Sequence, residues 1–222
     1  MSALEGTALR LEQILTTGAE EFGIHLSKEQ VERFFLYLSE LRKWNRKINL
    51  TAIREDGDIA VKHFLDSLSL VGVFTPQEGM KLLDMGSGAG FPALPLKMVY
   101  PGLSVTLVES VKKKASFLRH IIRTLRLDGV VVVDKRIEEL PGELVSPFDV
   151  VTARAFREIE ATILTGAPFL KSNGLMVLSR GPEETVGDEA LAKAGVTLER
   201  KEMLTLPCSD YQRAIWVFSK AG

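Results

Sequence analysis

The chain has 222 residues, of which 45% are hydrophobic and 26% charged, and its 28 basic side chains face 29 acidic ones. These fractions are ordinary for a folded globular protein and exclude intrinsic disorder, which needs fewer apolar residues and a larger charge imbalance. A net charge of −1 also excludes a uniformly basic protein that coats nucleic acid.

Hydrophobic side chains recur at helical spacing in the first third of the chain. The three repeats begin at Leu9, Val31 and Val61, and Ser27 has the character of a helix N-cap. No strand pattern of similar strength occurs before Gly79. We therefore predict an N-terminal helical region over residues 1–78.

From residue 79 onward, short apolar, β-branched runs alternate with helical segments. This alternation predicts a parallel sheet with helices on both faces, a doubly wound α/β domain over residues 79–222. The predicted strands are 81–85, 104–108, 130–133, 148–152, 175–178, 196–206 and 214–219. The predicted helices are 92–99, 111–126 and 158–169.

The strongest motif is DMGSGAGFP at residues 84–92, between a predicted strand and a predicted helix. Its glycines permit a tight turn and a close approach of the backbone to a ligand. A nicotinamide fingerprint would need glycine where Phe91 stands, and a phosphate loop would need a terminal Gly-Lys-Ser/Thr. The pattern resembles motif I of class I S-adenosylmethionine-dependent methyltransferases. Its residues are Asp84, Gly86, Gly88 and Gly90, and Phe91 is assigned to the same cofactor site.

Two later strand ends extend this assignment. Glu109 follows the second strand, where a carboxylate accepts hydrogen bonds from ribose hydroxyls; alone it would be interpreted as an exposed helix-capping acid. In the resembled superfamily the segment after the third strand lies beside adenine, so Ile137 is expected to pack on the ring and Glu138 or a main-chain group to meet its edge. Arg154, at the end of the fourth strand, is expected to point into the ligand crevice.

Four motifs in order resemble one family. They are NRKINLTAI at 45–53, HFLDSL at 63–68, motif I, and Arg154-Ala155-Phe156. Together they resemble the GidB/RsmG family of bacterial small-subunit (16S) ribosomal RNA guanine-N7 methyltransferases, over nearly the whole chain. The resemblance implies a class I methyltransferase (Rossmann-like) fold, S-adenosyl-L-methionine as cofactor, and ribosomal RNA of the small ribosomal subunit as partner. Ala93 and Arg180 stand where glycine and lysine are common, which leaves the role of Arg180 open.

The methylation chemistry of the resembled family indicates which arginines bind the substrate. Guanine N7 carries a lone pair and no proton, so its methylation requires no general base and rests on placement against the sulfonium methyl. Guanidinium groups can meet guanine O6 or phosphate in a bidentate manner. Arg136, Arg154 and Arg213 match basic positions of the family and are predicted to hold the guanosine. His63 and Asp66, at i and i+3, share one helical face and could contact RNA or the cofactor domain; the favoured interpretation is a helix-packing histidine and a surface acid.

Local charge also favours an anionic substrate. Positions 112, 119, 123 and 126 would form one basic face of a helix, and a second cluster surrounds Trp44. Neutralising Lys112 to Lys114 is expected to weaken salt-sensitive RNA binding. The competing interpretation is a solvated helix face with Trp44 in the core. The basic residues are Lys112, Lys113, Lys114, Arg119, Arg123, Arg126, Lys135 and Arg136, with Arg42, Lys43, Arg46 and Lys47 in the second cluster.

The cysteine and histidine content and the lack of targeting segments indicate the cellular compartment. The single Cys208 suits a reducing compartment, and His25, His63 and His120 lack metal-ligand spacing. The first ten residues lack a secretory apolar core, and no run approaches the roughly 18 apolar residues of a membrane span. We expect a cytoplasmic monomer without a metal or a membrane contact.

Two alternatives stay open at this level. One is a methyltransferase for a small molecule or a protein, which predicts a substrate pocket near Arg154 and activity without RNA. The other is a non-catalytic RNA- or nucleotide-binding module of the same fold. The intact glycine motif and Glu109 favour retained cofactor binding over the second alternative.

Overall fold

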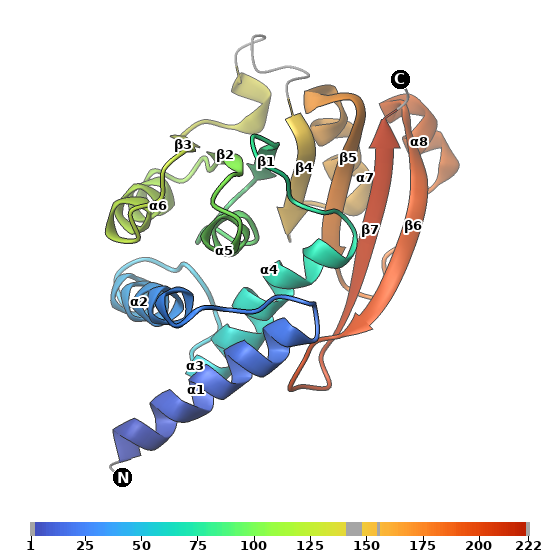
Figure 1. Cartoon of the computed structure of the whole chain (residues 1–222). Coiled ribbons are helices and arrows are strands. Elements are labelled where there is room, and N and C mark those ends of the chain that lie inside the picture. Colours follow the sequence, from blue (N-terminus) through green and yellow to red (C-terminus); the bar gives the residue numbers. More distant parts are fainter. Residues whose placement is uncertain (1–2, 141–147, 155, 221–222) are drawn as a thin grey trace.

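The computed structural model describes residues 3–140, 148–154 and 156–220, and it contains a seven-stranded sheet flanked by helices (Figure 1). The strand order is β3-β2-β1-β4-β5-β7-β6; β1 to β5 are parallel, and β7 runs antiparallel to both β5 and β6. The strands are β1 Lys81–Met85, β2 Ser104–Val108, β3 Val130–Val133, β4 Phe148–Arg154, β5 Leu170–Arg180, β6 Val196–Thr205 and β7 Gln212–Lys220. All seven predicted strands are confirmed, with β4, β5 and β7 longer than predicted.

Helices fill the N-terminal region and the crossovers of the sheet. The N-terminal elements are α1 Ala3–Glu20, α2 Lys28–Asn45, α3 Asp56–Ile59, the π-helical η1 Ala60–Leu65, α4 Asp66–Leu68 and the 3-10 turn η2 Ser69–Gly72. The later elements are α5 Ala93–Val99, α6 Lys112–Thr124, η3 Ile137–Glu139, α7 Ile159–Gly166, η5 Ala167–Phe169 and α8 Asp188–Ala194. Ser27 is the N-cap of α2, where a capping box with Gln30 satisfies backbone groups at the helix start.

The sheet separates two hydrophobic clusters, because successive side chains of a strand point to opposite faces. Leu82 and Val150 lie in one cluster, and their neighbours Leu83 and Val151 lie in the other. The first cluster joins the N-terminal helices to α5 and α6, and the second lies under α7 and α8.

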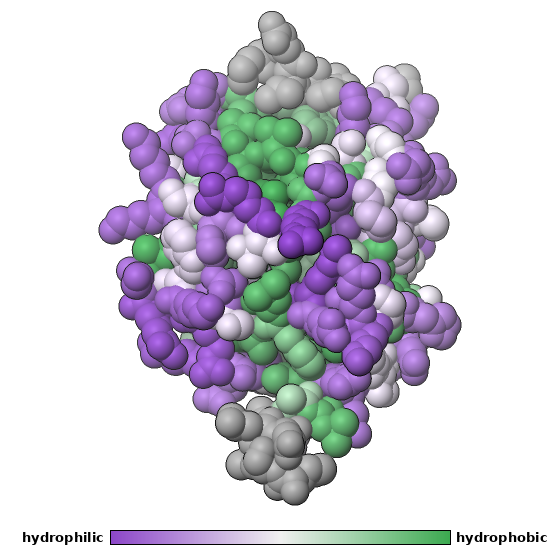
Figure 2. Space-filling view, turned by 60° about the vertical axis from the view of Figure 1, so that its left-hand side comes forward, coloured by the Kyte–Doolittle hydropathy of each residue, from purple (hydrophilic) through white to green (hydrophobic). Residues whose placement is uncertain are grey.

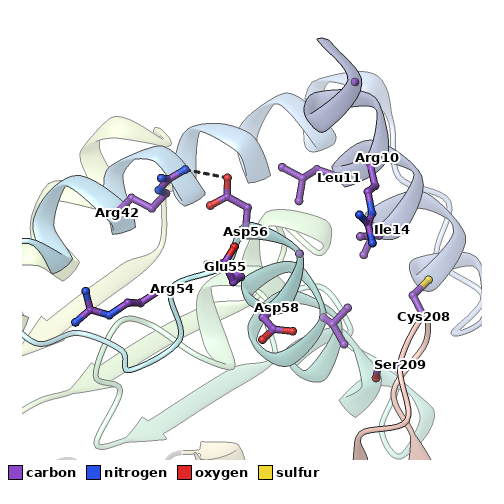
Figure 3. Close-up of a pocket in the computed structure, with 13 residues that line it drawn as sticks. Arg10, Leu11, Ile14, Arg42, Arg54, Glu55, Asp56, Asp58, Cys208 and Ser209 are labelled. Atoms are coloured by element: carbon purple, nitrogen blue, oxygen red, sulfur yellow. Dashed lines mark hydrogen bonds and ion pairs between the residues drawn. The ribbon is translucent and has the colours of Figure 1, made fainter. Parts of the chain in front are cut away.

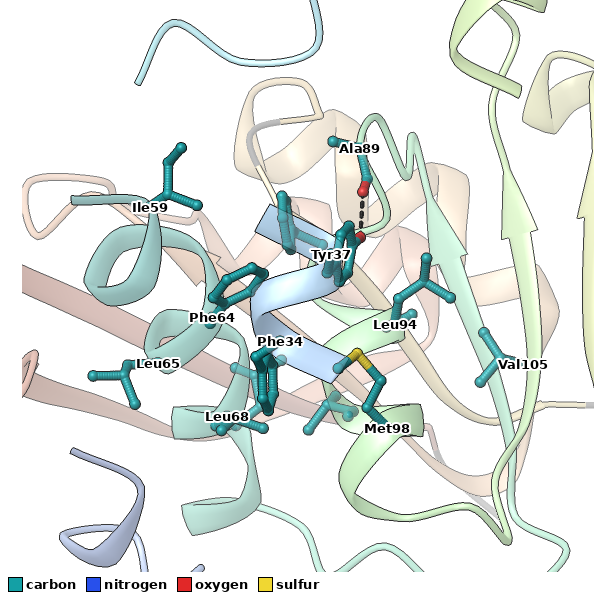
Figure 4. Close-up of a cluster of buried hydrophobic side chains, with 14 of the residues drawn as sticks. Phe34, Tyr37, Ile59, Phe64, Leu65, Leu68, Ala89, Leu94, Met98 and Val105 are labelled. Atoms are coloured by element: carbon teal, nitrogen blue, oxygen red, sulfur yellow. Dashed lines mark hydrogen bonds between the residues drawn. The ribbon is translucent and has the colours of Figure 1, made fainter. Parts of the chain in front are cut away.

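The N-terminal helices share their core with the sheet domain. Figure 4 shows Phe34 and Phe64 packed in one cluster with Leu94 and Met98 of α5, and the rings of Phe34 and Phe64 lie 5.0 Å apart. Burial of these rings stabilises both parts of the chain at once, by about 2 to 3 kcal/mol per side chain. This shared core therefore fixes the position of the N-terminal helices relative to the carboxyl ends of the strands.

Two negative findings apply to the described part of the chain. Among these residues no helix combines the length and the apolar character needed to cross a bilayer. The same residues contain no group of three or more His, Cys, Asp or Glu side chains arranged to hold a metal ion.

Candidate active site

The predicted cofactor residues meet at one edge of the sheet, because parallel strands place their carboxyl ends together. Met85, the last residue of β1, is in register with Val108 of β2 and with Ala153 of β4. The glycine turn, Glu109 and Arg154 directly follow or end these strands. These residues are far apart in the sequence but lie close together in the structure.

Glu109 ties the glycine turn to the turn after β2. Its two carboxylate oxygens accept hydrogen bonds from the backbone N–H groups of Gly88, at 2.9 Å, and of Val111, at 2.8 Å. The side chain is buried, so the interpretation as an exposed capping acid is wrong. The backbone N–H groups of Gly86 and Ser87 donate to the Val108 carbonyl and complete the connection.

Asp84 lies buried beneath the glycine turn. Neither carboxylate oxygen has a hydrogen-bond partner among the described residues, and burial raises the pKa of this group well above its ordinary value. Buried polar atoms without partners are rare in folded proteins and often mark a ligand site. Gly86 and Gly88 next to it have φ values of 68° and 56°, which favour glycine.

A cavity of about 240 Å³ lies beside this turn. Ile137 is buried in its wall, as the adenine assignment requires, whereas Glu138 is exposed and forms an ion pair with Arg157. Arg136 also lines this cavity, whereas Arg154 and Arg213, the other two arginines predicted to hold the guanosine, do not. The lining residues are Gly86, Val108, Ser110, Lys135, Arg136, Ile137, Glu138, Phe156 and Arg157.

Asp66 is not a surface acid, and that prediction is wrong. Its side chain is 0% exposed, and its Oδ1 accepts a hydrogen bond from Ser179 Oγ at 3.1 Å. Its Oδ2 accepts one from Arg213 Nε at 3.1 Å and lies 3.2 Å from a terminal nitrogen of Arg154. The helical pattern placed Asp66 on a helix, but only packing against β5 and β7 shows that this face is covered.

His63 belongs to the same buried cluster. Its Nδ1 lies 2.5 Å from a guanidinium nitrogen of Arg154, and its Nε2 lies 2.7 Å from Thr51 Oγ1. The imidazole stacks on Phe91 of the glycine turn, with ring centres 4.6 Å apart. His63 is therefore more than a helix-packing residue, since it connects Arg154 to the cofactor turn.

Tyr37 of α2 also reaches the glycine turn, which the sequence pattern did not reveal. Its hydroxyl donates to the Ala89 carbonyl at 2.5 Å, the hydrogen bond drawn in Figure 4. Its ring stacks on Phe91 at 5.4 Å, and burial raises its pKa well above the ordinary value. The helical repeat that begins at Val31 did not single out Tyr37, and no local signal distinguishes it.

The two basic clusters of the sequence converge where α2 ends and α6 begins. Lys47 lines one cavity of about 300 Å³ together with Lys113 and Lys114. Trp44 is half-buried against Phe117 and His120, which supports its assignment to the core. On the side that carries these helices, Figure 2 shows hydrophilic side chains along both flanks and hydrophobic ones in the upper and the lower middle.

The predicted basic face of α6 is only partly present. The helix ends at Thr124, and Arg126 lies beyond it with a φ of 51°, so it leaves the row of positions 112, 119 and 123. Arg119 forms an ion pair with Asp134 at 3.1 Å. Lys112 and Lys113 are exposed at the first turn.

A larger cavity, of about 720 Å³, lies elsewhere, between α1, α3 and the loop that joins β6 to β7. Figure 3 shows that its charged side chains have both signs, and Arg42 and Asp56 pair across it at 2.9 Å. None of the predicted cofactor residues lines this cavity, and neither do Arg136, Arg154 and Arg213. The smaller cavity beside the glycine turn is therefore the candidate cofactor site.

Comparison with known proteins decides the family. The model of the GidB family, described as rRNA small subunit methyltransferase G, matches residues 30–215. A ribosomal RNA small subunit methyltransferase G from Geotalea uraniireducens (strain Rf4) is 41% identical over 214 residues, 95% of this chain and 97% of that protein. One from Acetivibrio thermocellus is 36% identical over 217 residues, 96% of this chain and 89% of that protein. The chain belongs to the GidB family.

Solved structures agree on the fold. The YcgJ protein of Bacillus subtilis covers 72% of this chain and all of its own, with a TM-score of 0.56 and 16% identity. A SAM-dependent methyltransferase from Aquifex aeolicus covers 69% of this chain and 89% of its own, with a TM-score of 0.52 and 18% identity. These likenesses concern the fold alone, and they confirm the predicted class I methyltransferase architecture for this GidB protein.

The two departures from the family pattern are structural in this GidB protein. Arg180 is buried, and its guanidinium donates to the Arg157 carbonyl and to Thr162 Oγ1, both at 2.6 Å. It thereby holds the start of α7 against the segment that follows β4. Ala93 is fully buried at the first position of α5, where its methyl group contributes to the core.

The buried His63 of this GidB protein is expected to make its stability sensitive to acid. Burial, with Arg154 beside it, lowers the pKa of His63 from 6.5 to about 3. Between these values the unfolded chain binds a proton that the folded chain does not, so the free energy of unfolding falls as pH falls below 6.5. From about pH 7 to about pH 5 this contribution amounts to about 2 kcal/mol.

Urea unfolding of the wild-type protein and of His63→Asn at both pH values measures this contribution. The variant lacks the titrating ring and should lose about 2 kcal/mol less than the wild type on acidification. An equal loss in the two proteins would contradict a neutral folded His63.

Proposed function

We propose that this GidB-family protein transfers a methyl group from S-adenosyl-L-methionine to N7 of a guanosine in 16S ribosomal RNA. The observation that carries the proposal is the family match over residues 30–215, with the glycine turn and Glu109 joined at the carboxyl edge of the sheet. The substrate is then the small ribosomal subunit or its RNA, encountered in the cytoplasm. The enzyme is proposed to act as a monomer.

Gly86, Ile137 and Glu138 line the smaller cavity, and with Gly88 and Glu109 of the adjoining turns they fit the cofactor. Gly86 and Gly88 would bring backbone against it, and Glu109 would accept hydrogen bonds from the ribose hydroxyls with its remaining lone pairs. Ile137 would pack on adenine, and Glu138 would meet the edge of the ring. When bound, S-adenosyl-L-methionine supplies an electrophilic methyl group on a sulfonium centre.

The chain contributes placement rather than proton transfer. N7 of guanine attacks with its own lone pair, so no side chain has to remove a proton. His63 fits this view, because its lowered pKa makes it a weak base and its Nδ1 faces Arg154. Holding N7 in line with the methyl group is worth several orders of magnitude in rate.

The arginines would bind the guanosine and its phosphates. Arg154 and Arg213 lie together at the carboxyl edge through their shared partner Asp66, and Arg136 lines the cofactor cavity. Methylation makes N7 cationic, so an arginine cannot stabilise the product charge. Binding O6 and phosphate oxygens is the role that suits a guanidinium group.

Transfer of a labelled methyl group tests the function. The protein is incubated with labelled S-adenosyl-L-methionine and with either undermethylated small subunits or naked 16S RNA, and the label is mapped. Label at N7 of one guanosine is the expected result. Label in protein or in a small molecule instead, or no label in RNA, would overturn the proposal, and the two RNA samples identify the form of substrate.

Lys113 and Lys114 are expected to bind the RNA backbone at the junction of α2 and α6. Replacing both by glutamine should lower the salt dependence of RNA binding, with the slope of log K against log salt falling by about 1.4 to 1.8. The double replacement of Lys28, at the opposite end of α2, and Lys193 of α8 is the control of equal charge. Equal salt slopes in both double variants would contradict the assignment.

A further inference from the structure

Two arginines of the sheet share one buried carboxylate from the N-terminal helices. Arg154 ends β4, and Arg213 lies at the start of β7, beside the carboxyl end of the neighbouring β5. Asp66 at the start of α4 receives both guanidinium groups on Oδ2, at 3.2 and 3.1 Å. Its Oδ1 accepts from Ser179 of β5, so the carboxylate spans three strands.

His63 holds the other side of Arg154. Arg154 lies 2.5 Å from Nδ1 of His63, and the Lys62 carbonyl lies 3.1 Å from the same atom. A guanidinium can only donate, so the contact with Arg154 requires a neutral ring whose Nδ1 accepts, and Nε2 of this ring lies 2.7 Å from Thr51 Oγ1. Arg154 is thus fixed between Asp66 and His63, one helical turn apart in the motif HFLDSL.

The charges of this cluster do not cancel. Two guanidinium groups face one carboxylate and a neutral ring, so these four side chains together carry one excess positive charge, and the buried Asp84 nearby also interacts electrostatically with Arg154. The Arg154 and Arg213 side chains remain 15% and 14% exposed, whereas Asp66 is 0% exposed. The acid is therefore placed behind the arginines, where it orients them without reaching an RNA substrate.

We propose that Asp66 is a positioning residue for methyl transfer, which with His63 fixes Arg154 and Arg213 in the orientation that binds the guanosine. This inference rests on the proposed function. Its consequence is that the N-terminal helices form part of the active site, since they supply the anchor for both arginines. Without the carboxylate, the two guanidinium groups repel each other and lose a common geometry.

Replacement of Asp66 by asparagine is the principal test. The change keeps the shape and removes the charge; the expected result is a fall of about 30-fold in kcat/KM for small subunits, mainly through a higher KM. The dissociation constant of S-adenosyl-L-methionine should change by less than about 3-fold, because Asp66 does not line the cofactor cavity. Asp149→Asn is the matched control, at the amino end of the same β4 strand, where the acid binds Lys81 and Lys171.

A double-mutant cycle separates positioning from a merely structural role. If Asp66 acts through Arg213, the variant that combines Asp66→Asn with Arg213→Gln should be no worse in kcat/KM than the poorer single variant. His63→Asn keeps an acceptor for Arg154 and should retain more activity than His63→Leu. This comparison keeps the proposal testable should Asp66→Asn fail to fold.

The possible results distinguish the positioning role of Asp66 from the proposed function. Additive effects in the cycle, wild-type kinetics in Asp66→Asn, or equal losses in Asp66→Asn and Asp149→Asn would overturn the positioning role. Equal activity of His63→Asn and His63→Leu would also contradict it. A wild-type protein that places no label in RNA would instead overturn the proposed function.

Discussion

Gly90→Ala is expected to abolish measurable binding of S-adenosyl-L-methionine, with a loss of affinity of at least about 100-fold, and to lower the free energy of unfolding by about 3 kcal/mol. Gly90 has a φ of 93°, which alanine adopts only under strain. An added Cβ would lie 2.5 Å from Leu94 Cδ1 and 2.6 Å from the Tyr37 hydroxyl. The turn would have to move, and with it the backbone N–H groups of Gly86 and Gly88.

Gly23→Ala is the matched control for this substitution. Gly23 has a similar φ of 72°, but an added Cβ would meet nothing within 4 Å. This variant should lose about 1 kcal/mol of stability and keep wild-type affinity for the cofactor. Isothermal titration calorimetry and urea unfolding of both variants provide the comparison. Wild-type cofactor binding by Gly90→Ala would exclude the turn from the cofactor site.

Glu109→Gln is expected to weaken cofactor binding by about 100-fold, although the substitution is nearly isosteric. In the native protein each carboxylate oxygen accepts one backbone N–H, from Gly88 and from Val111. A glutamine amide has only one oxygen, so its NH2 group must face one of these two donors. The turns after β1 and β2 then separate, and the charged acceptor for the ribose is also lost.

Glu139→Gln provides the corresponding control, since Glu139 is an exposed acid of η3 next to the same cavity. Its cofactor affinity should equal that of the wild type. Equilibrium dialysis with labelled S-adenosyl-L-methionine measures both variants. Should Glu109→Gln bind as tightly as Glu139→Gln, the carboxylate would be a structural link between the turns and no ribose acceptor.

The sequence predicted the elements that depend on local patterns. Seven strands followed from short β-branched runs, and the start of α2 followed from Ser27, because alternation and capping act over a few residues. The glycine turn and Glu109 were also local signals, since each directly follows a strand. The parallel sheet then brings them together at its carboxyl edge, as its geometry requires.

The sequence pattern did not predict that the last strands are antiparallel. β7 lies between β5 and β6, although it follows β6 in the chain. Apolar alternation is identical for a parallel and an antiparallel strand, so the pattern could not give its direction or its place. That placement brings Arg213 beside Ser179 and completes the environment of Asp66.

Sequence by itself determined the class of fold, the glycine turn and the family of this protein, because these depend on motifs whose residues lie within a few positions of one another. Only the tertiary structure decided which polar residues are buried and with whom they pair. Asp66 was interpreted as a surface acid and Tyr37 was not singled out, yet they contact Arg154 and the glycine turn, respectively. The physical reason is that burial and ion pairing depend on contacts between segments far apart in the chain, which a single sequence does not encode locally.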